Sequence, residues 1–199
     1  MTSSKIQLLD VTLIALTSHK IPDHEDAIKK SCEGIEFGGV KIIYDFNIKT
    51  IDQWSYEMVY NLGDYVQTSH ALIIHADGYV INPQLWKDEW LQYDYIGAPF
   101  PLPIDNFSYR DINDKIQRVG NSVGLRSKKL MQLPKKLGME WKPFHGYWHE
   151  DGFISVNMRH VFEEHGCKFA PLEVAVHFSK EYEIPENVGL STFMFHKVG

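Results

Sequence analysis

One short segment places the strongest constraint on the fold of this chain. An apolar run of strand type, residues 72–75 (LIIH), stops at Ala76-Asp77-Gly78. In an open α/β sheet, ligands bind in the crevice at the carboxyl ends of the strands. A carboxylate at such an end, with a small residue before it and a glycine after it, can approach a divalent metal or a ribose without crowding. The alternative is local: Asp-Gly is a common turn dipeptide, and Asp77 then only caps a turn.

Strand-like and helix-like patterns alternate around this segment. The predicted elements are strands over 11–16, 40–44 and 71–75, a helix over 24–33 with Asp23 as its N-cap and Gly34 as its stop, and an amphipathic helix over 52–68. Strand–helix repeats of this size predict an α/β fold with a Rossmann-like, mostly parallel central sheet flanked by helices.

After residue 80 the pattern becomes less regular. The predicted elements are a helix over 82–93, a short strand over 94–101, a long irregular segment over 102–118, a glycine-rich strand over 119–126, and helices over 127–137 and 151–165. From residue 169 onward, short apolar runs alternate with polar turns. No repeat or linker interrupts the chain, so one domain over residues 1–199 is expected.

Composition narrows the class of partner. Apolar residues make up 44% of the 199 residues and aromatic residues 13%, which is typical of a dense globular core. A formal charge of −6 without any basic block argues against a nucleic-acid partner, which needs clustered Lys and Arg. The chain shows neither a secretory signal nor a transmembrane segment, and its two cysteines, Cys32 and Cys167, lie far apart. A cytoplasmic protein is therefore expected; the oligomeric state is not indicated.

Several motifs, taken together, resemble a known family. They are residues 71–80 (ALIIHADGYV), 93–99 (YDYIGAP), 119–127 (VGNSVGLRS), Glu150-Asp151, 168–175 (KFAPLEVA), 178–181 (FSKE) and Phe195-His196. This combination resembles a family of small bacterial and viral proteins of unknown function that is regarded as glycosyltransferase-like. The resemblance covers nearly the whole chain. It implies a single GT-A-like domain, with a nucleotide-sugar-binding half over about 1–80 and an acceptor half over about 81–199.

The resemblance implies a metal-assisted, inverting glycosyltransferase that moves a sugar from a nucleotide-sugar donor to a hydroxyl of a glycan or other acceptor. Mn²⁺ or Mg²⁺ would neutralise the diphosphate leaving group. Asp77 is the expected metal ligand, and His75 stands where a full DxD motif has its first acid, so His75 either binds Mn²⁺ or contacts ribose or phosphate. His196 is the second expected metal ligand; its alternative is a surface histidine beside Phe195.

The same resemblance makes the Glu150-Asp151 pair the expected general base, with Asp151 the better candidate. The alternative is that Asp151 only N-caps its helix. The acceptor is expected to contact Asn121, Trp148 and His149, because an aromatic face is a natural platform for a sugar ring. A locally aromatic core is the competing interpretation.

Binding of the nucleotide part is expected at the strand ends. The expected residues are Thr17, Ser18 and His19 after the first strand, Asp45 after the second, and His75, Asp77 and Gly78 after the third.

Two segments depart from the family pattern. Ser122 and Val123 follow Asn121 where the family usually has two glycines, and Met194 and Lys197 replace glycines around Phe-His. The competing hypothesis is therefore a catalytically inactive nucleotide- or carbohydrate-binding module of the same fold. A metal-dependent phosphohydrolase is a further hypothesis, and it is less favoured because it would need further carboxylates close to Asp77.

Overall fold

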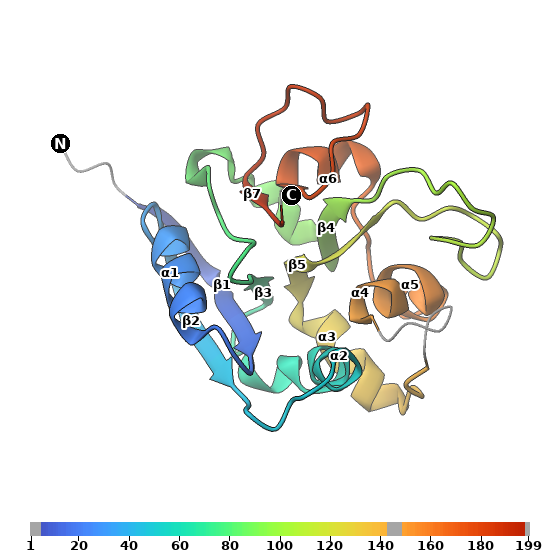
Figure 1. Ribbon diagram of the computed structural model, residues 1–199, viewed down its shortest axis with the longest axis horizontal. Helices are drawn as coiled ribbons and strands as arrows, with labels where there is room; N and C mark the ends of the chain where they lie inside the picture. The colour runs from blue at the N-terminus through green and yellow to red at the C-terminus, as the bar shows by residue number, and fades with distance from the viewer. Residues whose placement is uncertain (1–4, 143–148, 198–199) are drawn as a thin grey trace.

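A five-stranded sheet in the order β2-β1-β3-β5-β4 runs through the computed structural model, which describes residues 5–142 and 149–197 (Figure 1). The strands are β1 (Ile6–Thr17), β2 (Ile35–Tyr44), β3 (His70–Ile73), β4 (Tyr95–Pro99) and β5 (Val119–Ser127). β1 pairs in parallel with β2 and β3, whereas β5 is antiparallel to both β3 and β4. The α/β class is thus confirmed, and the expected mostly parallel sheet is corrected to a mixed one. The long segment after β4 returns the chain to the edge where the parallel strands end, so β5 must run in the opposite direction.

Helices cover both faces of this sheet (Figure 1). They are α1 (Ile21–Cys32), α2 (Ile51–Tyr60), α3 (Lys128–Leu137), α4 (Glu150–Gly152), α5 (Arg159–Glu164) and α6 (Leu172–Phe178). Single turns of other helix types are η1 (Leu62–Tyr65), η2 (Pro83–Leu85), η3 (Asp88–Gln92) and the π-helical η4 (Phe153–Asn157). None of the helices in the described part of the chain has the length and hydropathy needed to cross a bilayer.

The period of two along the strands sends alternate side chains to opposite faces of the sheet. In β3, Leu72 packs with the core on the α1 side, whereas Ala71 and Ile73 pack with the core under α2. In β1, Leu13 and Ile14 divide in the same way. These strands are buried on both faces, which is why their sequences are continuous apolar runs.

The first-half helices differ in extent from their predicted ranges. α1 begins at Ile21, and Lys20, with φ 53°, occupies the N-cap position, so the prediction of Asp23 as N-cap is wrong. The predicted helix over 52–68 ends at Tyr60 and continues only as η1. Thr50 caps α2 by accepting a hydrogen bond from the Gln53 N–H.

Larger differences occur in the second half. The predicted helix over 82–93 consists of the two 3₁₀ turns η2 and η3. The predicted helix over 151–165 begins one residue earlier and is divided into α4, η4 and α5. The helix α6 was not predicted, because its 7 residues form too short a segment to show a helical period.

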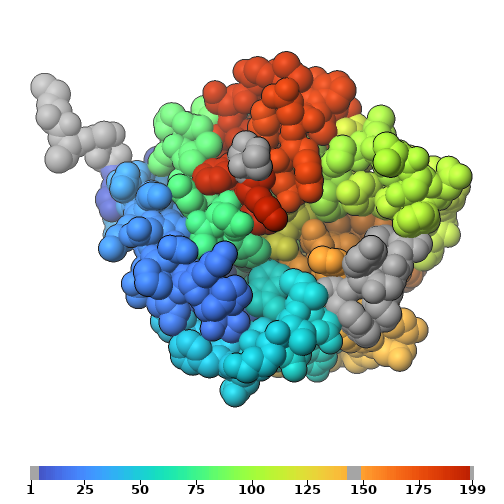
Figure 2. Space-filling model, in the orientation of Figure 1, coloured from blue at the N-terminus to red at the C-terminus, as the bar shows by residue number. Residues whose placement is uncertain are grey.

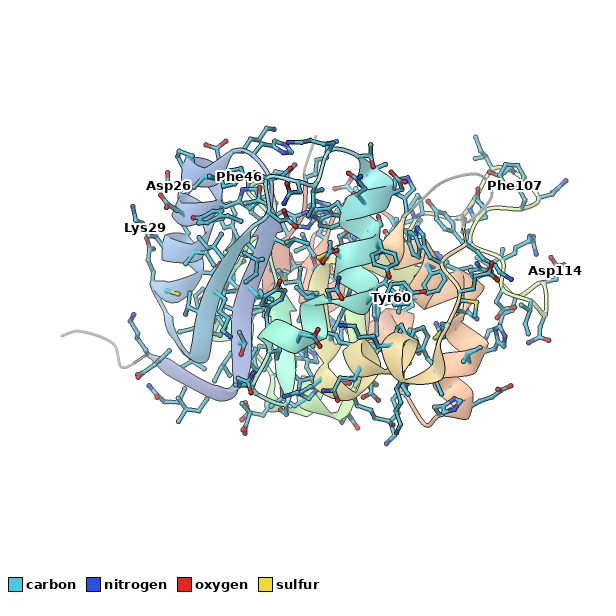
Figure 3. The ribbon with its side chains drawn as sticks, turned by 90° about the horizontal axis from the view of Figure 1, so that it is seen from below. Asp26, Lys29, Phe46, Tyr60, Phe107 and Asp114 are labelled. Atoms are coloured by element: carbon cyan, nitrogen blue, oxygen red, sulfur yellow. The ribbon has the colours of Figure 1, made fainter. Side chains whose placement is uncertain are left out.

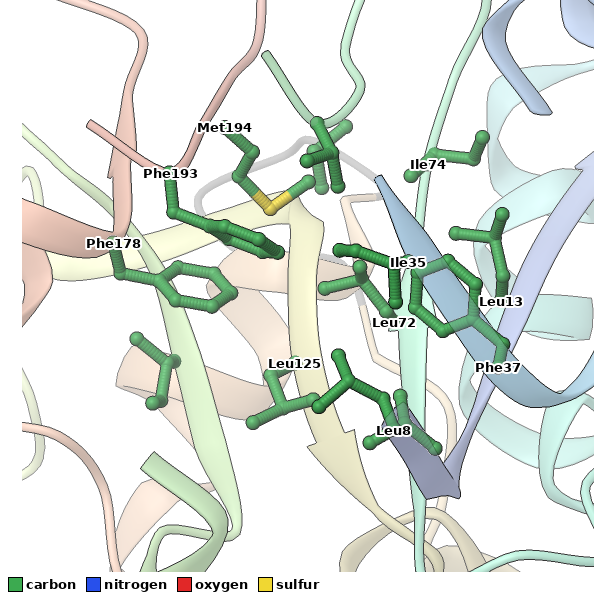
Figure 4. Close-up of a cluster of buried hydrophobic side chains, with 14 of the residues drawn as sticks. Leu8, Leu13, Ile35, Phe37, Leu72, Ile74, Leu125, Phe178, Phe193 and Met194 are labelled. Carbon is green, nitrogen blue, oxygen red and sulfur yellow. The ribbon is translucent and has the colours of Figure 1, made fainter. Parts of the chain in front are cut away.

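The C-terminal segment crosses back over the sheet and completes the core. Its short strands β6 (Ser179–Lys180) and β7 (Met194–Phe195) pair in parallel. Figure 4 shows Phe178, Phe193 and Met194 beside the strand residues Leu72 and Leu125, and all five are buried in one cluster. Burial of two or three such side chains contributes several kcal/mol, at roughly 1.5–3 kcal/mol each. This packing anchors the residues that follow β6 and β7.

Candidate active-site cleft

A cleft with a volume of about 830 Å³ opens at the carboxyl ends of the parallel strands. Its walls include the segment after β1, the start of α2, the turn after β3, and the residues that follow β6 and β7. In Figure 2 these segments meet near the centre of the view, where blue, cyan, green and red surfaces come together. The position agrees with the expectation that ligands bind at the ends of the strands.

Three potential metal ligands meet in this cleft. One ligand atom from each of His75, Asp77 and His196 lies within 4.8 Å of the other two. The His196 Nε2 atom is 3.7 Å from the Asp77 carboxylate and 3.4 Å from the His75 Nδ1 atom. We refer to His75, Asp77 and His196 as the His–Asp–His cluster. The structure thus brings together three of the residues singled out in the sequence, although His196 is separated from the others by more than a hundred positions.

Backbone pairing explains this convergence. β7 lies between β6 on one side and the chain around Tyr79 on the other, where the N–H of Phe195 donates to the Tyr79 carbonyl. One step further, the Lys197 N–H donates to the Asp77 carbonyl. A Cβ atom at Gly78 would lie 2.8 Å from the His196 ring and 3.1 Å from its Cα atom. Gly78 is therefore needed for the close approach of the C-terminal segment.

Both imidazoles of the cluster favour the neutral form. Burial, reinforced by the neighbouring His196, holds the pKa of His75 well below its ordinary value. Burial also lowers the pKa of His196, against the opposing charge of Asp77. The buried Nε2 atom of His75 and Nδ1 atom of His196 have no hydrogen-bond partner among the described residues. A histidine binds a metal through a ring nitrogen that carries no proton, so the neutral form of the ring is the one that can act as a ligand.

His75 is also packed from the side of α2. Its ring makes an edge contact with Trp54, with ring centroids 5.3 Å apart. The Trp54 indole N–H donates to the carbonyl of Leu16 near the end of β1. This hydrogen bond links Trp54, which packs against His75, to the end of β1.

The two acids of the Glu150-Asp151 pair lie in different environments. The Glu150 carboxylate lines the cleft but forms an ion pair with Arg126 of β5 at 3.0 Å, and both side chains are 1% exposed. Arg126 also lies over the Tyr95 ring, 5.4 Å from its centroid. The Glu150 carboxylate is therefore engaged by a buried cation.

Asp151 is the second acid of the pair, and its pKa is shifted upward. Burial, together with the charge of Glu150, raises its pKa to about 6. Its Oδ1 atom accepts a hydrogen bond from the neighbouring Gly152 N–H. Asp151 is not among the described residues that line the cleft, but its charge adds to burial in raising the pKa of Glu181, which does line the cleft.

The other expected contacts of the sugar donor divide into two groups. Thr17, Ser18 and His19 line the cleft. Asp45 instead lines a neighbouring hollow of about 340 Å³, with Tyr56 and Trp141 among its walls. The structure therefore separates Asp45 from the His–Asp–His cluster.

The expected acceptor contacts are placed as follows. His149 lines the cleft, and Trp148 lies outside the described residues. Asn121 is buried with φ 84°, and its amide bridges the Val123 N–H and the Glu181 carboxylate. The neighbouring Ser122, one of the departures from the family pattern, lines the cleft.

Sequence reasoning missed Glu181, a residue of the cleft, and Arg126, the buried partner of the cleft residue Glu150. Burial together with the charge of Asp151 raises the pKa of Glu181 to about 7. The available signal was its position at the end of the FSKE motif. Arg126 was recognisable as a charge inside a predicted buried strand, where an unpaired guanidinium is not tolerated.

Comparison with known proteins supports the same type of fold. The sequence profile of a family described as "Protein of unknown function (DUF5672)" matches residues 43–194. A crystal structure of a glycosyltransferase involved in the glycosylation of the major capsid of PBCV-1 superposes with a TM-score of 0.60 at 12% sequence identity. The superposition covers 95% of this chain and 93% of that one. No protein with curated annotation matches the sequence.

Proposed function

The chain belongs to the DUF5672 family, and from this premise we propose that it is a glycosyltransferase that uses a nucleotide-sugar donor. The observation that carries the proposal is the His–Asp–His cluster inside a cleft at the carboxyl ends of the strands. The likeness to the viral glycosyltransferase in fold supports it, because the two chains superpose over nearly their full lengths.

The cluster suits Mn²⁺ better than Mg²⁺. Two imidazoles and one carboxylate form its ligand set. Mg²⁺ prefers oxygen ligands and retains several waters, whereas first-row transition metals accept imidazole nitrogen. When bound, Mn²⁺ would act as a Lewis acid that neutralises the diphosphate leaving group.

The residues around the cluster would hold the rest of the sugar donor. Thr17 and Ser18 offer hydroxyls at the end of β1, where a ribose is expected. Lys30 and Lys49 line the same cleft and supply positive charge toward a diphosphate. These contacts are assigned from position and charge. They would favour the binding of an anionic nucleotide.

Asp151 is the proposed general base. It takes the proton of the acceptor hydroxyl while the acceptor oxygen bonds to the anomeric carbon and the bond from that carbon to the diphosphate oxygen breaks. A single displacement of this kind inverts the configuration at the anomeric carbon. Glu150 is not assigned this role, because Arg126 neutralises it.

Asp77→Asn tests the proposal. We expect binding of a nucleoside diphosphate or nucleotide sugar, measured calorimetrically, to require Mn²⁺ in the unaltered protein and to weaken at least ~10-fold in the variant. Asp114→Asn is the matched control, since Asp114 lies at the outer end of the segment between β4 and β5 (Figure 3) and its side chain is 83% exposed. Because the Asp77 side chain is 58% exposed, the substitution should leave the fold intact.

Thermal unfolding with a panel of nucleotide sugars would then identify the sugar donor. A ligand present at 100 times its dissociation constant stabilises the native state by about 2.7 kcal/mol. Stabilisation without turnover of any nucleotide sugar would favour the inactive binding module. Absence of any metal-dependent stabilisation would contradict the glycosyltransferase proposal and would favour an inactive or acceptor-binding module.

A further inference from the structure

Glu181 lies beside His196 because of the register of two short strands. β6 and β7 are parallel, with Ser179 opposite Met194 and Lys180 opposite Phe195. Continuing this register by one residue brings Glu181 level with His196. The N–H of His196 donates to the Lys180 carbonyl at 3.0 Å, so the backbone holds the two side chains at the same level.

The two nitrogens of the His196 ring face different groups. Nε2 faces the His–Asp–His cluster, 3.7 Å from the Asp77 carboxylate. Nδ1 is buried and faces a Glu181 carboxylate oxygen at 3.6 Å, and it has no hydrogen-bond partner among the residues described. This separation is longer than a hydrogen bond, so the proposed role requires the His196 ring and the Glu181 carboxylate to approach each other further.

The other oxygen of Glu181 is already held. It accepts a hydrogen bond from the Asn121 Nδ2 atom at 2.6 Å, while the Asn121 Oδ1 atom accepts the Val123 N–H at 2.9 Å. The backbone donor of Val123 thus determines which end of the Asn121 amide points at Glu181. Within residues 5–142 and 149–197, the other Glu181 oxygen, Oε1, forms no hydrogen bond, and it lies 3.6 Å from the His196 Nδ1 atom.

We propose that Glu181 is a positioning residue that selects the tautomer of His196 in which Nδ1 carries the proton and Nε2 is free to bind a metal. The inference rests on the proposed metal site. A metal-bound histidine commonly donates its other ring N–H to a carboxylate, which orients the ring and raises its basicity as a ligand. Asn121 acts one step further out by orienting Glu181.

Glu181→Gln is the informative variant, because it inverts this selection without changing size. The glutamine oxygen must face the donating Asn121 amide, so its NH₂ group faces the His196 Nδ1 atom. Nδ1 then accepts a hydrogen bond and the proton moves to Nε2, which can no longer serve as a ligand. Glu183→Gln makes the same chemical change on the same segment, at an exposed residue that pairs with Lys180 at 3.2 Å.

The experiment has two readouts. Nitrogen-15 NMR of the metal-free protein at pH ~8, where histidines are neutral, reports the tautomer of His196 directly. We expect the Nδ1–H form in the unaltered protein and in Glu183→Gln, and the Nε2–H form in Glu181→Gln. Calorimetric titration with Mn²⁺ alone should show 10–100-fold weaker binding in Glu181→Gln, which is about the loss usual for such a partner of a metal ligand.

The two readouts separate this inference from the proposed function. An unchanged tautomer in Glu181→Gln, or Mn²⁺ affinity within twofold of the unaltered protein, would overturn the role of Glu181. If the unaltered protein does not bind Mn²⁺ at all, the proposed metal site fails, and the tautomer measurement still decides whether Glu181 orients His196. A retained fold in each variant is checked by its unfolding midpoint.

Discussion

The two ends of the cleft differ in the exposure of their side chains and in the interactions that hold those side chains in place. At one end, the Asp77 side chain of the His–Asp–His cluster is 58% exposed and its chemistry depends on backbone pairing. At the other end, the Arg126–Glu150 ion pair is 1% exposed and joins β5, an interior strand of the sheet, to α4. The first end can lose a side chain without loss of core packing, whereas the second cannot.

Because of this difference, a substitution at one end should affect binding or catalysis, and a substitution at the other end should affect the free energy of unfolding. A solvated carboxylate such as that of Asp77 contributes little to the free energy of unfolding, because water replaces its contacts when it is removed. A buried ion pair is strongly destabilising when one partner is removed, because the other charge is left without compensation. Substitutions at the two ends should therefore give different pairs of changes in function and stability.

The largest effect is expected for Arg126→Ala. It leaves the Glu150 carboxylate buried without its cation and should lower the free energy of unfolding by about 3–5 kcal/mol. Chemical denaturation measures this loss. The double variant Arg126→Leu with Glu150→Leu removes both charges and should recover most of the stability; if it does not, packing and not charge accounts for the loss.

Asp151→Asn should act on turnover and leave the fold intact. Removing the proposed base should lower transfer at least ~10²-fold, with affinity for the sugar donor unchanged. In the unaltered protein, transfer should rise with pH through about 6, where the carboxylate loses its proton. Near-normal turnover in the variant would move the role of base to another group.

The same variant has a stability signature. Because the pKa of Asp151 is raised from 3.8 to about 6 on folding, its contribution is present at low pH and is lost as the pH rises through about 6. Asp151→Asn, which carries no charge, should therefore be more stable than the unaltered protein at pH 7, by on the order of 2 kcal/mol. Denaturation curves at pH 4 and pH 7 should show this difference shrinking at the lower pH.

The smallest effect is expected for Asp45→Asn. Asp45 lines the neighbouring hollow, and its Oδ1 atom accepts the Asn47 N–H at 2.9 Å, a contact that the asparagine oxygen preserves. Nucleotide affinity should stay within ~2-fold and stability within ~0.5 kcal/mol. A loss of affinity of ~10-fold or more would place this hollow within the binding site of the sugar donor.

The sequence predicted the strands better than the helices. The interior parts of strands, such as residues 11–16 of β1 and 71–73 of β3, are largely apolar, and a run of this kind is recognisable without knowledge of its neighbours. The polar starts of β1 and β2 were missed, since each strand begins five residues before its predicted range. The helices over 82–93 and 151–165 were overestimated, since the pattern does not show where tertiary contacts divide a helix. β5 was found as a strand, but its direction depends on its partners.

The candidate site shows the same difference between features that follow from neighbouring residues and features that depend on tertiary contacts. Local order was enough to single out Asp77 and Gly78, because an apolar run that ends at an acid and a glycine is a property of neighbouring residues. The partnership of Glu150 with Arg126 was not predictable, since ion pairing depends on the distance between side chains from separate elements.

By itself, the sequence determined the α/β class, the position of Asp77 at a strand end and the family to which the chain belongs. Only the tertiary structure decided that His196 joins Asp77, that Glu181 faces His196, and that Glu150 is neutralised. Strand positions follow from the local alternation of apolar side chains, which each residue carries independently of the fold. The meeting of residues far apart in the chain depends on register, and register is set by the hydrogen bonds and packing of the whole molecule.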